Sequence, residues 1–515
     1  METSYDFDGL FVFDLANNHQ GSVAHGSAVI RSIGSSVRRH AVKGALKFQF
    51  RELETFVHPA HRQASTNKHI PRFLSTRLSW PQFAELLAVV RNEGLIAMTT
   101  PFDESSVDTA VRMGFDILKV ASCSAQDWPL LEVIAAAGKP VIFSTGGCSM
   151  EDIDSLVSFF DHRAVDFAIM HCISMYPTPA ERCSLNQIEV LKSRFPGRTI
   201  GWSTHEEQDE VAPVQVAYAK GARIFERHVG MEAEGIALNS YSSRPEQVDR
   251  WLEGFAKAKA LCGSGNERPQ SPPEEQEALM SLRRGMFARQ DLPAGTKVDR
   301  DDVFFAMPWS SGQLFSGQWR PGIVLRNAVA MNAPLLEAEV EIPPEPEYAV
   351  LKRAVHQIKA LLNEAKIRLD TNFRVEYSHH YGLARFRSVG CVLIDCVNRE
   401  YCKKLIVQLP GQSHPLHYHR RKEETFQVLS GELWLDVDGH KRCLKAGETA
   451  LVLPGVWHRF WTTTGAIVEE ISTTHFNDDS FYRDPEIQNK PRESRKTKVD
   501  HWGRFELVDR LVGDE

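Results

Sequence analysis

The 515-residue sequence lacks several features that would place it in a special class of proteins. It has nine cysteines, an odd number, and no two of them form a Cys-x-x-Cys pair, which argues against a disulfide framework or a cysteine zinc site. We therefore expect most of them to be reduced core residues. No apolar run approaches the ~18 residues that a membrane-spanning helix needs, so we expect no contact with a membrane.

The sequence also has no excess of positive charge. The net charge of -7 and the pI near 6.3 give no general attraction to nucleic acid or to an anionic membrane, so an anionic ligand would need local basic residues. The N-terminal stretch METSYDFDGLFVFD is acidic where a signal peptide would be basic and then apolar. We expect a cytoplasmic protein of several domains, because the chain is longer than one core ordinarily serves.

Short apolar runs recur through the first half of the chain, as in proteins that alternate strands and helices. They lie near residues 10, 45, 95, 116, 140, 167, 198 and 222. Between them are amphipathic stretches such as WPQFAELLAVVRNEG, which close with a glycine. About eight strand-helix units in roughly 250 residues predict a closed (β/α)8 TIM barrel over residues 1–265. An open doubly wound sheet is the alternative.

Polar residues stand at the C-terminal end of nearly every run. In a barrel these ends meet at one mouth, where such enzymes keep their active sites. Each residue alone could have a purely structural role, since Ser and Thr often cap helices and Lys is usually solvated. Such separate roles do not readily explain why polar residues end nearly every run. The set comprises Asp14, Asn17, Lys47, Gln49, Thr100, Lys119, Ser122, Ser144, Ser174, Ser203, His205, Glu226 and His228.

The residue types in this set indicate the kind of ligand. Lys47 and Lys119, together with the hydroxyl groups, favour a doubly anionic ligand that carries a phosphate and a carboxylate. His205 and His228 could bind a divalent cation and leave positions open for substrate.

Further segments follow the barrel. We predict a Pro- and Glu-rich linker over 266–280, a small α+β domain with short strands over 281–342, and a linker helix over 343–370. Closely spaced strands predict an all-β domain over 371–480. Residues 481–515 have the composition of a charged, mobile tail.

The stretch GQSHPLHYHRRKEETFQVLSG, residues 411–431, has the spacing of a metal site. His417 and His419 are two apart on a predicted strand, so both side chains face the same side, and Glu424 enters from the neighbouring strand. The spacing resembles the first motif of the cupin barrel, and AGETALVLPGVWHRFW supplies His458 as a fourth ligand. Three imidazoles and one carboxylate suit Mn²⁺, Fe²⁺, Zn²⁺ or Ni²⁺.

Other histidines lie near this motif without its spacing. His379, His380 and His414 are expected to be ordinary surface or loop residues. A metal-free cupin with hydrogen-bonded barrel histidines remains the alternative to a metal site.

Several barrel motifs resemble the sialic acid synthase family. They are DLANNHQGS, LKFQ, TTPFDESSVD, LKVASCSAQDWPLLEVIAAAGKPVIFSTGG, MHCISMYPTPAERCSL, and IGWSTH followed by FERHV. The segment from Arg283 to about residue 341 resembles the antifreeze-like (SAF) domain that follows the barrel in that family. The family condenses phosphoenolpyruvate with an aldose and forms a nine-carbon 2-keto acid and phosphate.

The resemblance implies a role for each residue of the predicted mouth. His205 and His228 would hold Mn²⁺ or Mg²⁺, while Gln49, Tyr176 and Glu226 would face the sugar. Phosphoenolpyruvate would be received by Lys47, Thr100, Lys119, Ser122, Ser144, Ser174 and Ser203. The resemblance also implies a domain-exchanged homodimer, in which the small domain of one subunit covers the barrel of its partner.

The sequence departs from the family at three positions on the sugar side. Asp14 stands where many members have a glutamate, which weakens its assignment to proton handling or water positioning. Ser124 replaces a second glutamate that often contacts sugar hydroxyls, and Met307 replaces an arginine that usually reaches the acyl group. The acceptor therefore need not be N-acetylmannosamine.

The cupin part, with EEISTTHFNDDSFYRDPEI after its last predicted strand, resembles D-lyxose isomerase-like cupins. Our leading hypothesis is a phosphoenolpyruvate-dependent, carbon-carbon bond-forming transferase, a nonulosonic acid synthase, with an appended metal cupin that isomerises or binds a sugar. One alternative is a cupin-driven sugar isomerase or epimerase with a subsidiary barrel. Another is a non-catalytic sugar-sensing protein.

Overall fold

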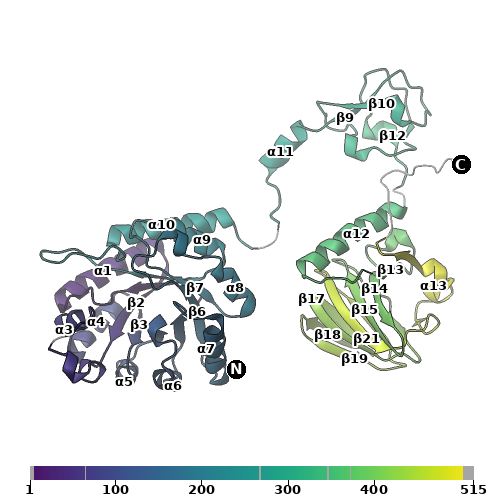
Figure 1. Ribbon diagram of the computed structural model, residues 1–515. Helices are drawn as coiled ribbons and strands as arrows, with labels where there is room; N and C mark the ends of the chain where they lie inside the picture. The colour runs from purple at the N-terminus through teal and green to yellow at the C-terminus, as the bar shows by residue number, and fades with distance from the viewer. Residues whose placement is uncertain (1–4, 64, 266–267, 345–346, 372, 503–515) are drawn as a thin grey trace. The chain divides into compact units, whose positions relative to one another are not determined.

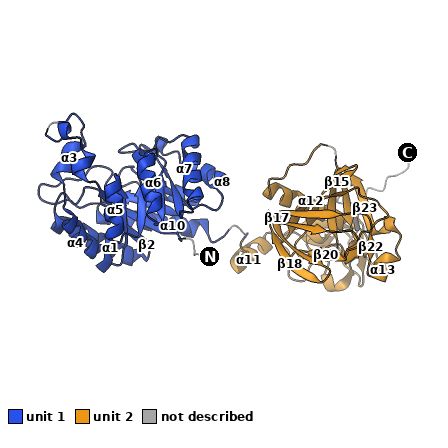
Figure 2. Ribbon diagram, turned by 90° about the horizontal axis from the view of Figure 1, so that it is seen from below, with its two compact units in different colours: residues 1–268 blue, residues 269–515 orange. Residues whose placement is uncertain are grey.

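The computed structural model describes residues 5–63, 65–265, 268–344, 347–371 and 373–502. The chain divides into two compact units, residues 1–268 and 269–515 (Figure 2). Within the described ranges, no helix is both long enough and apolar enough to cross a membrane.

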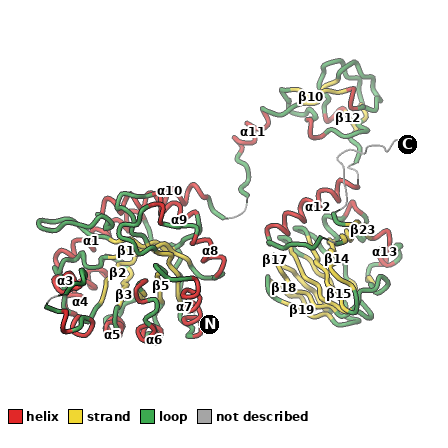
Figure 3. Tube along the Cα trace, in the orientation of Figure 1, coloured by secondary structure: helices red, strands yellow, loops and turns green. Residues whose placement is uncertain are grey.

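Parallel strands close into a barrel in the first unit (Figure 1, Figure 3). They are β1 (Leu10–Asp14), β2 (Lys43–Phe50), β3 (Ile96–Pro101), β4 (Ile117–Val120), β5 (Val141–Ser144), β6 (Phe167–Cys172), β7 (Ile200–Ser203) and β8 (Ile224–His228). They follow one another in chain order, and β8 pairs with β1. The predicted closed barrel is confirmed, and the open sheet is excluded.

Helices cover the outside of this barrel. The main ones are α1 (Val23–His40), α4 (Trp80–Asn92), α5 (Glu104–Arg112), α6 (Trp128–Ala136), α7 (Met150–His162), α8 (Gln187–Arg194), α9 (Ala212–Ala219) and α10 (Pro245–Cys262). Polar caps fix where several begin: the Ser79 side chain accepts a hydrogen bond from the backbone of Gln82 at the start of α4. Their apolar faces pack on outward-facing strand residues such as Phe11 and Phe48.

An excursion separates β2 from α4. It contains α2 (Leu53–Phe56), the 3-10 turn η1 (Pro59–His61) and α3 (Ile70–Ser75). No comparable insertion was predicted, because its short apolar pieces do not repeat at a helical or strand period.

The second unit begins with a small region that has its own core. A helix, α11 (Pro273–Ser281), lies where a linker was predicted. It is followed by two antiparallel pairs, β9 (Gly285–Ala288) with β10 (Val303–Ala306), and β11 (Val324–Leu325) with β12 (Val340–Glu341). Their core includes Met286, Leu314, Ile323 and Leu335. The likeness of this region to an SAF domain stays a prediction.

The remaining strands form the all-β cupin domain. They are β13 (Arg374–Ser378), β14 (Cys391–Asn398), β15 (Tyr401–Gln408), β16 (His417–Tyr418), β17 (Glu424–Val437), β18 (His440–Lys445), β19 (Thr449–Val452), β20 (His458–Trp461) and β21 (Ala466–Thr473). The long strand β17 pairs with β18, β19, β20 and β21, and so connects the two faces of the domain.

Two expectations about the ends of this domain are wrong. Helix α12 (Glu347–Glu364), predicted as a linker, packs Leu351, Val355 and Ile358 into the same core as Val375 of β13. The predicted charged tail instead forms β22 (Phe481–Tyr482), α13 (Pro485–Gln488) and β23 (Lys496–Asp500), and β23 pairs with β13. Residues 503–515 lie outside the described residues.

The cysteines agree only in part with the sequence prediction. All nine are free thiols, as expected, but the buried ones are only Cys172, Cys183, Cys391 and Cys402. The others are exposed or half-buried, so the expectation that most lie in a core is wrong.

Candidate functional site

A cavity of about 860 Å³ opens at the C-terminal ends of the barrel strands. Every residue predicted for the mouth lines it: Asp14, Asn17, Lys47, Gln49, Thr100, Lys119, Ser122, Ser144, Ser174, Tyr176, Ser203, His205, Glu226 and His228. Ser124 is buried but is not among the described residues that line this cavity. Met307 lies in the second unit, where its side chain is exposed.

The alternation of strand residues explains this convergence. Inward-facing positions near the N-terminal ends of the strands are apolar and form one core cluster, with Val12, Ala45 and Ile224 among its members. Two residues further along each of these strands, the same inward side carries Asp14, Lys47 and Glu226. The barrel therefore has an apolar floor, above which charged side chains face the cavity.

Two lysines and two carboxylates form a buried cluster in this cavity. Lys47 Nζ lies 2.5 Å from Glu226 Oε1 and 3.0 Å from Asp14 Oδ2, and Lys119 Nζ also donates to Glu226. Burial disfavours the charged form of Lys47, but Asp14 and Glu226 outweigh it and raise the lysine pKa. Lys119 has Glu226 alone, and burial together with repulsion from Lys47 lowers its pKa. An anionic ligand would meet both ammonium groups here.

The carboxylate of Glu226 is held ionised between these lysines. Burial opposes its ionisation, but the charges of Lys119 and Lys47 and their hydrogen bonds lower its pKa. The four charged groups balance one another in this arrangement, which is what makes their burial tolerable.

Hydroxyl groups with no partner face the same space. Thr100 Oγ1 and Ser144 Oγ are buried, and no described residue hydrogen-bonds to either of them. The loop after β5 brings further hydroxyls close, because a Cβ on Gly146 would lie 2.2 Å from Ser174 Oγ and 2.7 Å from Ser122 Oγ. A buried donor without a partner costs free energy, so these hydroxyls are suited to a ligand that accepts hydrogen bonds.

The two predicted metal-binding histidines lie side by side. The ring centroids of His205 and His228 are 5.4 Å apart, and His205 Nδ1 lies 3.0 Å from the carbonyl oxygen of Ile173. Because a carbonyl accepts only from N–H, Nδ1 carries the proton and Nε2 keeps its lone pair. His228 Nε2 lies 3.6 Å from Asp14 Oδ2, and burial lowers the His228 pKa, which favours the neutral imidazole that binds metals. These residues fit a divalent cation.

A second candidate site lies inside the cupin domain. Nitrogen atoms of His417, His419 and His458 lie within 4.8 Å of one another, and all three side chains are buried. Each Nδ1 contacts a backbone carbonyl oxygen: that of Pro415 at 3.0 Å, Asp479 at 2.7 Å and Val456 at 3.1 Å. Each Nδ1 therefore carries the proton, and the Nε2 lone pairs are left for a metal.

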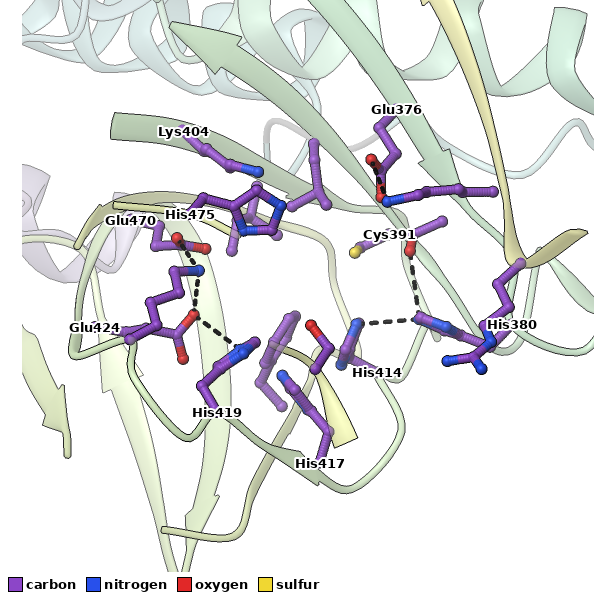
Figure 4. Close-up of a pocket in the computed structure, with 18 of the residues that line it drawn as sticks. Glu376, His380, Cys391, Lys404, His414, His417, His419, Glu424, Glu470 and His475 are labelled. Atoms are coloured by element: carbon purple, nitrogen blue, oxygen red, sulfur yellow. Dashed lines mark hydrogen bonds and ion pairs between the residues drawn. The ribbon is translucent and has the colours of Figure 1, made fainter. Parts of the chain in front are cut away.

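The carboxylate of Glu424 completes this donor set. Its Oε2 lies 3.1 Å from His458 Nε2. Its Oε1 lies 3.4 Å from His419 Nε2 (Figure 4). Neither Glu424 Oε2 nor His458 Nε2 has a hydrogen-bond partner among the described residues. Two buried lone pairs that face each other without a proton repel, and a cation between them removes the repulsion. The four residues fit a divalent metal ion.

Sequence analysis missed charged residues at both sites. In the cupin, Lys422 Nζ lies 2.6 Å from Glu424 Oε1 and 2.5 Å from Glu470 Oε1, and all three side chains are buried. Its spacing of two from Glu424 was a usable signal, since both side chains then face the same side. At the barrel mouth, Arg51 continues the alternation of Lys47 and Gln49, and it lines the cavity with Lys68 and Arg72.

Three cupin histidines are more buried than predicted. His379, His380 and His414 lie outside the named strands, as expected for loop residues, but their exposed fractions are only 6%, 2% and 7%. His380 Nε2 lies 3.1 Å from His414 Nε2, and the His414 ring stacks on Phe460. The prediction that they are surface residues is wrong, because packing rather than spacing decides their burial.

Comparisons with known proteins agree with this two-part architecture. Residues 37–267 match the NeuB family and residues 405–472 match the cupin domain. The chain is 31% identical over 296 residues to the uncharacterized protein MJ1065 of Methanocaldococcus jannaschii, which covers 56% of this chain and 82% of that protein. It is 26% identical to the N,N'-diacetyllegionaminic acid synthase of Legionella pneumophila, over 51% of this chain and 77% of the relative.

A solved structure extends the match. The crystal structure assigned to spore coat polysaccharide biosynthesis protein E of Chromobacterium violaceum is 43% identical, with a TM-score of 0.62. It covers 65% of this chain and 99% of its own. Together with the closed barrel, these similarities show that the chain belongs to the NeuB family and carries a cupin domain in its C-terminal part.

Proposed function

We propose that the barrel condenses phosphoenolpyruvate with an aldose, forming a sialic acid-like 2-keto acid and phosphate. The observation that carries this proposal is the convergence, in one cavity, of two buried lysines and the unpartnered hydroxyls of Thr100 and Ser144 beside a histidine pair. Family membership supports it, since a relative is named as a synthase of this kind.

The lysines and hydroxyls provide an anion pocket. Phosphoenolpyruvate carries a phosphate and a carboxylate, and both are strong acceptors for ammonium and hydroxyl donors. Lys47 and Lys119 are held in place by Asp14 and Glu226 before any ligand arrives, so little reorganisation accompanies binding.

The histidine pair lies beside this pocket. His205 and His228 would hold a divalent cation, which supplies Lewis-acid polarisation of the aldehyde. The new bond joins C3 of the enol phosphate to the aldehyde carbon; water then adds at C2, and phosphate leaves. Lys47 and Lys119 offset the charge that remains on phosphate and carboxylate. Asp14 Oδ2 lies 3.2 Å from Gln49 Nε2 and also contacts Lys47, so we assign it a positioning role.

The test uses the full chain with phosphoenolpyruvate, Mn²⁺ and a panel of aldoses, and it measures phosphate release and the mass of the keto acid. Ser144→Ala should raise the KM for phosphoenolpyruvate about tenfold, because one anion donor is lost. Ser35→Ala, on the exposed face of α1, is the matched control. Absence of phosphate release with every aldose would count against the proposal.

A second candidate function belongs to the cupin. We propose that it binds a divalent metal and acts on, or binds, a sugar there. The observation that favours this is the Lys422 and Glu470 pair beside His417 and His419, since all four residues line one cavity of about 90 Å³. Replacing His417 and His419 with alanine should abolish any aldose isomerisation by the full chain and leave condensation in place. Loss of both activities would contradict separate sites.

A further inference from the structure

Two arginines that line the cupin cavity have no carboxylate beside them. They are Arg492 and Arg495, the first and last residues of the 3-10 turn η8 (Arg492–Arg495). Side chains three residues apart on a 3-10 helix lie on the same side of it, so one turn brings both to the cavity. Among the described residues, no carboxylate oxygen lies within 4.0 Å of a side-chain nitrogen of either arginine.

Arg495 is the more buried of the two, with an exposed fraction of 8%. Its Nε donates to the backbone carbonyl of Lys490 at 3.1 Å, and its Nη2 donates to that of Gln488 at 3.0 Å. Its Nη1 has no hydrogen bond to a described residue. The backbone thus holds one side of the guanidinium and leaves a donor unused on the other. A buried guanidinium is costly unless a ligand supplies the opposite charge.

The carboxylates that line this cavity are already engaged. Glu424 and Glu470 share Lys422, and Glu376 is shared by two lysines of β23, each at 3.2 Å. These three lysines and three glutamates balance one another. The two arginines of η8 therefore remain as an excess of positive charge, although the whole protein has a net charge of -7.

The remaining lysine of the cavity does not change this balance. Lys404 Nζ lies 3.1 Å from Asp395 Oδ1. Figure 4 shows Lys404 across the cavity from His417. A divalent cation at the histidines would add to the positive charge, so an anionic ligand is favoured whether or not the metal is bound.

One aromatic ring lies between Arg495 and the histidine cluster. Tyr482 of β22 is the register partner of His417 of β16, and the centroids of their rings lie 5.6 Å apart. The guanidinium carbon of Arg495 lies 5.5 Å from the centroid of the same tyrosine ring. A ligand that contacts the metal-binding histidines can therefore extend past Tyr482 to Arg495.

We propose that the ligand of the cupin is a sugar acid, and that Arg492 and Arg495 bind its carboxylate. This inference rests on the proposed metal and sugar site of the cupin and names the class of sugar. A neutral aldose leaves both arginines without a counter-charge. A sugar acid supplies, in one molecule, a carboxylate for the guanidinium groups and hydroxyl or carbonyl oxygens for a metal. The 2-keto acid proposed as the product of the barrel belongs to this class.

The donors that are left favour a carboxylate over a phosphate. A carboxylate carries one negative charge and two acceptor oxygens, one for each arginine. A phosphate monoester carries close to two negative charges and three acceptor oxygens, so it needs more donors. Arg495 has used its Nε and Nη2 on backbone carbonyls, and Arg492 Nη2 donates to the carbonyl oxygen of Asp478 at 3.3 Å.

The experiment measures by calorimetry how the full chain, loaded with Mn²⁺, binds matched acids and neutral molecules. The pairs are D-glucuronate with D-glucose, and N-acetylneuraminate with its methyl ester; D-glucose 6-phosphate is added as a phosphate. His419→Ala lacks a cupin ligand, so its binding reports the barrel alone, and the difference from the wild type reports the cupin. We expect the cupin to bind each acid about ten- to hundredfold more tightly than its neutral counterpart.

Arg492→Gln and Arg495→Gln should each lower this preference about tenfold and leave the binding of the neutral molecules unchanged. Arg492 is exposed, so its variant remains informative even if Arg495→Gln folds poorly. Arg374→Gln is the matched control, because Arg374 is exposed, pairs with Asp500 and does not line the cavity. It should keep the wild-type preference.

The outcomes separate this inference from the function beneath it. Equal binding of acids and neutral molecules by the cupin would overturn the inference and leave a cupin that binds neutral sugars. Tighter binding of D-glucose 6-phosphate than of D-glucuronate, or an unchanged preference in Arg492→Gln, would also overturn it. The same binding of every ligand by His419→Ala and the wild type would overturn the cupin site together with the inference.

Discussion

Asp14 and Lys47 are register partners on the paired strands β1 and β2, and their side chains meet at 3.0 Å. On its other side Asp14 is the register partner of His228, whose Nε2 lies 3.6 Å from the same carboxylate oxygen. One aspartate thus joins the lysine pocket to the histidine pair. Strand register alone brings it there, because β1 lies between β2 and β8.

Asp14→Asn should lower condensation activity by about a hundredfold, since the amide keeps the shape but no longer balances Lys47 or orients His228. Steady-state kinetics with phosphoenolpyruvate and the best aldose provide the measurement. Asp8→Asn, an exposed change in the segment before β1, should behave like the wild type. Wild-type activity in Asp14→Asn would show that the carboxylate has no part in the reaction.

His419→Ala should remove one metal equivalent from the full chain, because the triad loses a buried ligand beside Glu424. Metal content by mass spectrometry after gel filtration measures this, and a chelator should lower the melting temperature of the wild type more than that of the variant. His440→Ala, at an exposed position of β18, is the control. Equal metal content in both variants would contradict a cupin metal site.

Lys422→Met should destabilise the cupin domain by about 3–5 kcal/mol, since Glu424 and Glu470 would be left as buried carboxylates without their shared cation. Chemical denaturation of the full chain gives the free energy of unfolding. Adding Glu470→Leu should recover part of the loss, because one of the unpaired charges is then removed. Additive losses in the double variant would indicate that the ion pair is not what stabilises this region.

The barrel should lose stability as the pH falls below about 6.5. Burial lowers the pKa of His19 to about 4 in the folded protein. Between this pH and about 6.5, His19 is protonated in the unfolded chain but neutral in the folded one. The full stability is present above the pKa of the unfolded chain and is lost as the pH falls toward 4. By pH 5 the loss in the free energy of unfolding is about 2 kcal/mol. Thermal melting of the full chain from pH 7 to pH 4.5 measures it.

His19→Asn is the comparison for this prediction. His19 Nδ1 accepts from the backbone N–H of Gly21 at 3.1 Å, and an asparagine oxygen can accept in its place without titrating. The variant should show a shallower fall with pH, whatever its stability at pH 7. The same slope in both proteins would assign the acid sensitivity to other groups.

The barrel and its mouth could be predicted because their signals are local. Each strand is a short apolar run, and the polar residue at its end is a neighbour in sequence, as with Ile117 and Lys119 on β4. The cupin histidine cluster was predictable for the same reason, since His417 and His419 are two residues apart and face the same side. Closure of the sheet then brings the strand ends together without further information.

The buried charged residues could not be predicted, because their burial depends on partners that lie far away in the chain. Lys422 gives no sign in the sequence that Glu470, on β21, neutralises it inside the domain. Lys496 and Lys498 read as a solvated tail, yet both contact the buried carboxylate of Glu376 at 3.2 Å. Arg51 reads as a surface residue until the excursion brings Phe73 against its guanidinium.

The pairing of β23 with β13 also determines the C-terminal boundary of any fragment that is meant to contain the whole cupin domain. The first and last strands of the cupin sheet lie side by side, so a fragment that stops at residue 480 would leave the backbone amides and carbonyls of β13 open along Arg374–Ser378. In the whole domain the edge strand is β23, whose Lys496 and Lys498 discourage pairing with other molecules, whereas an exposed β13 would lack these two lysines. Expression of the isolated domain therefore requires the chain to run through at least Asp500 to stay monodisperse.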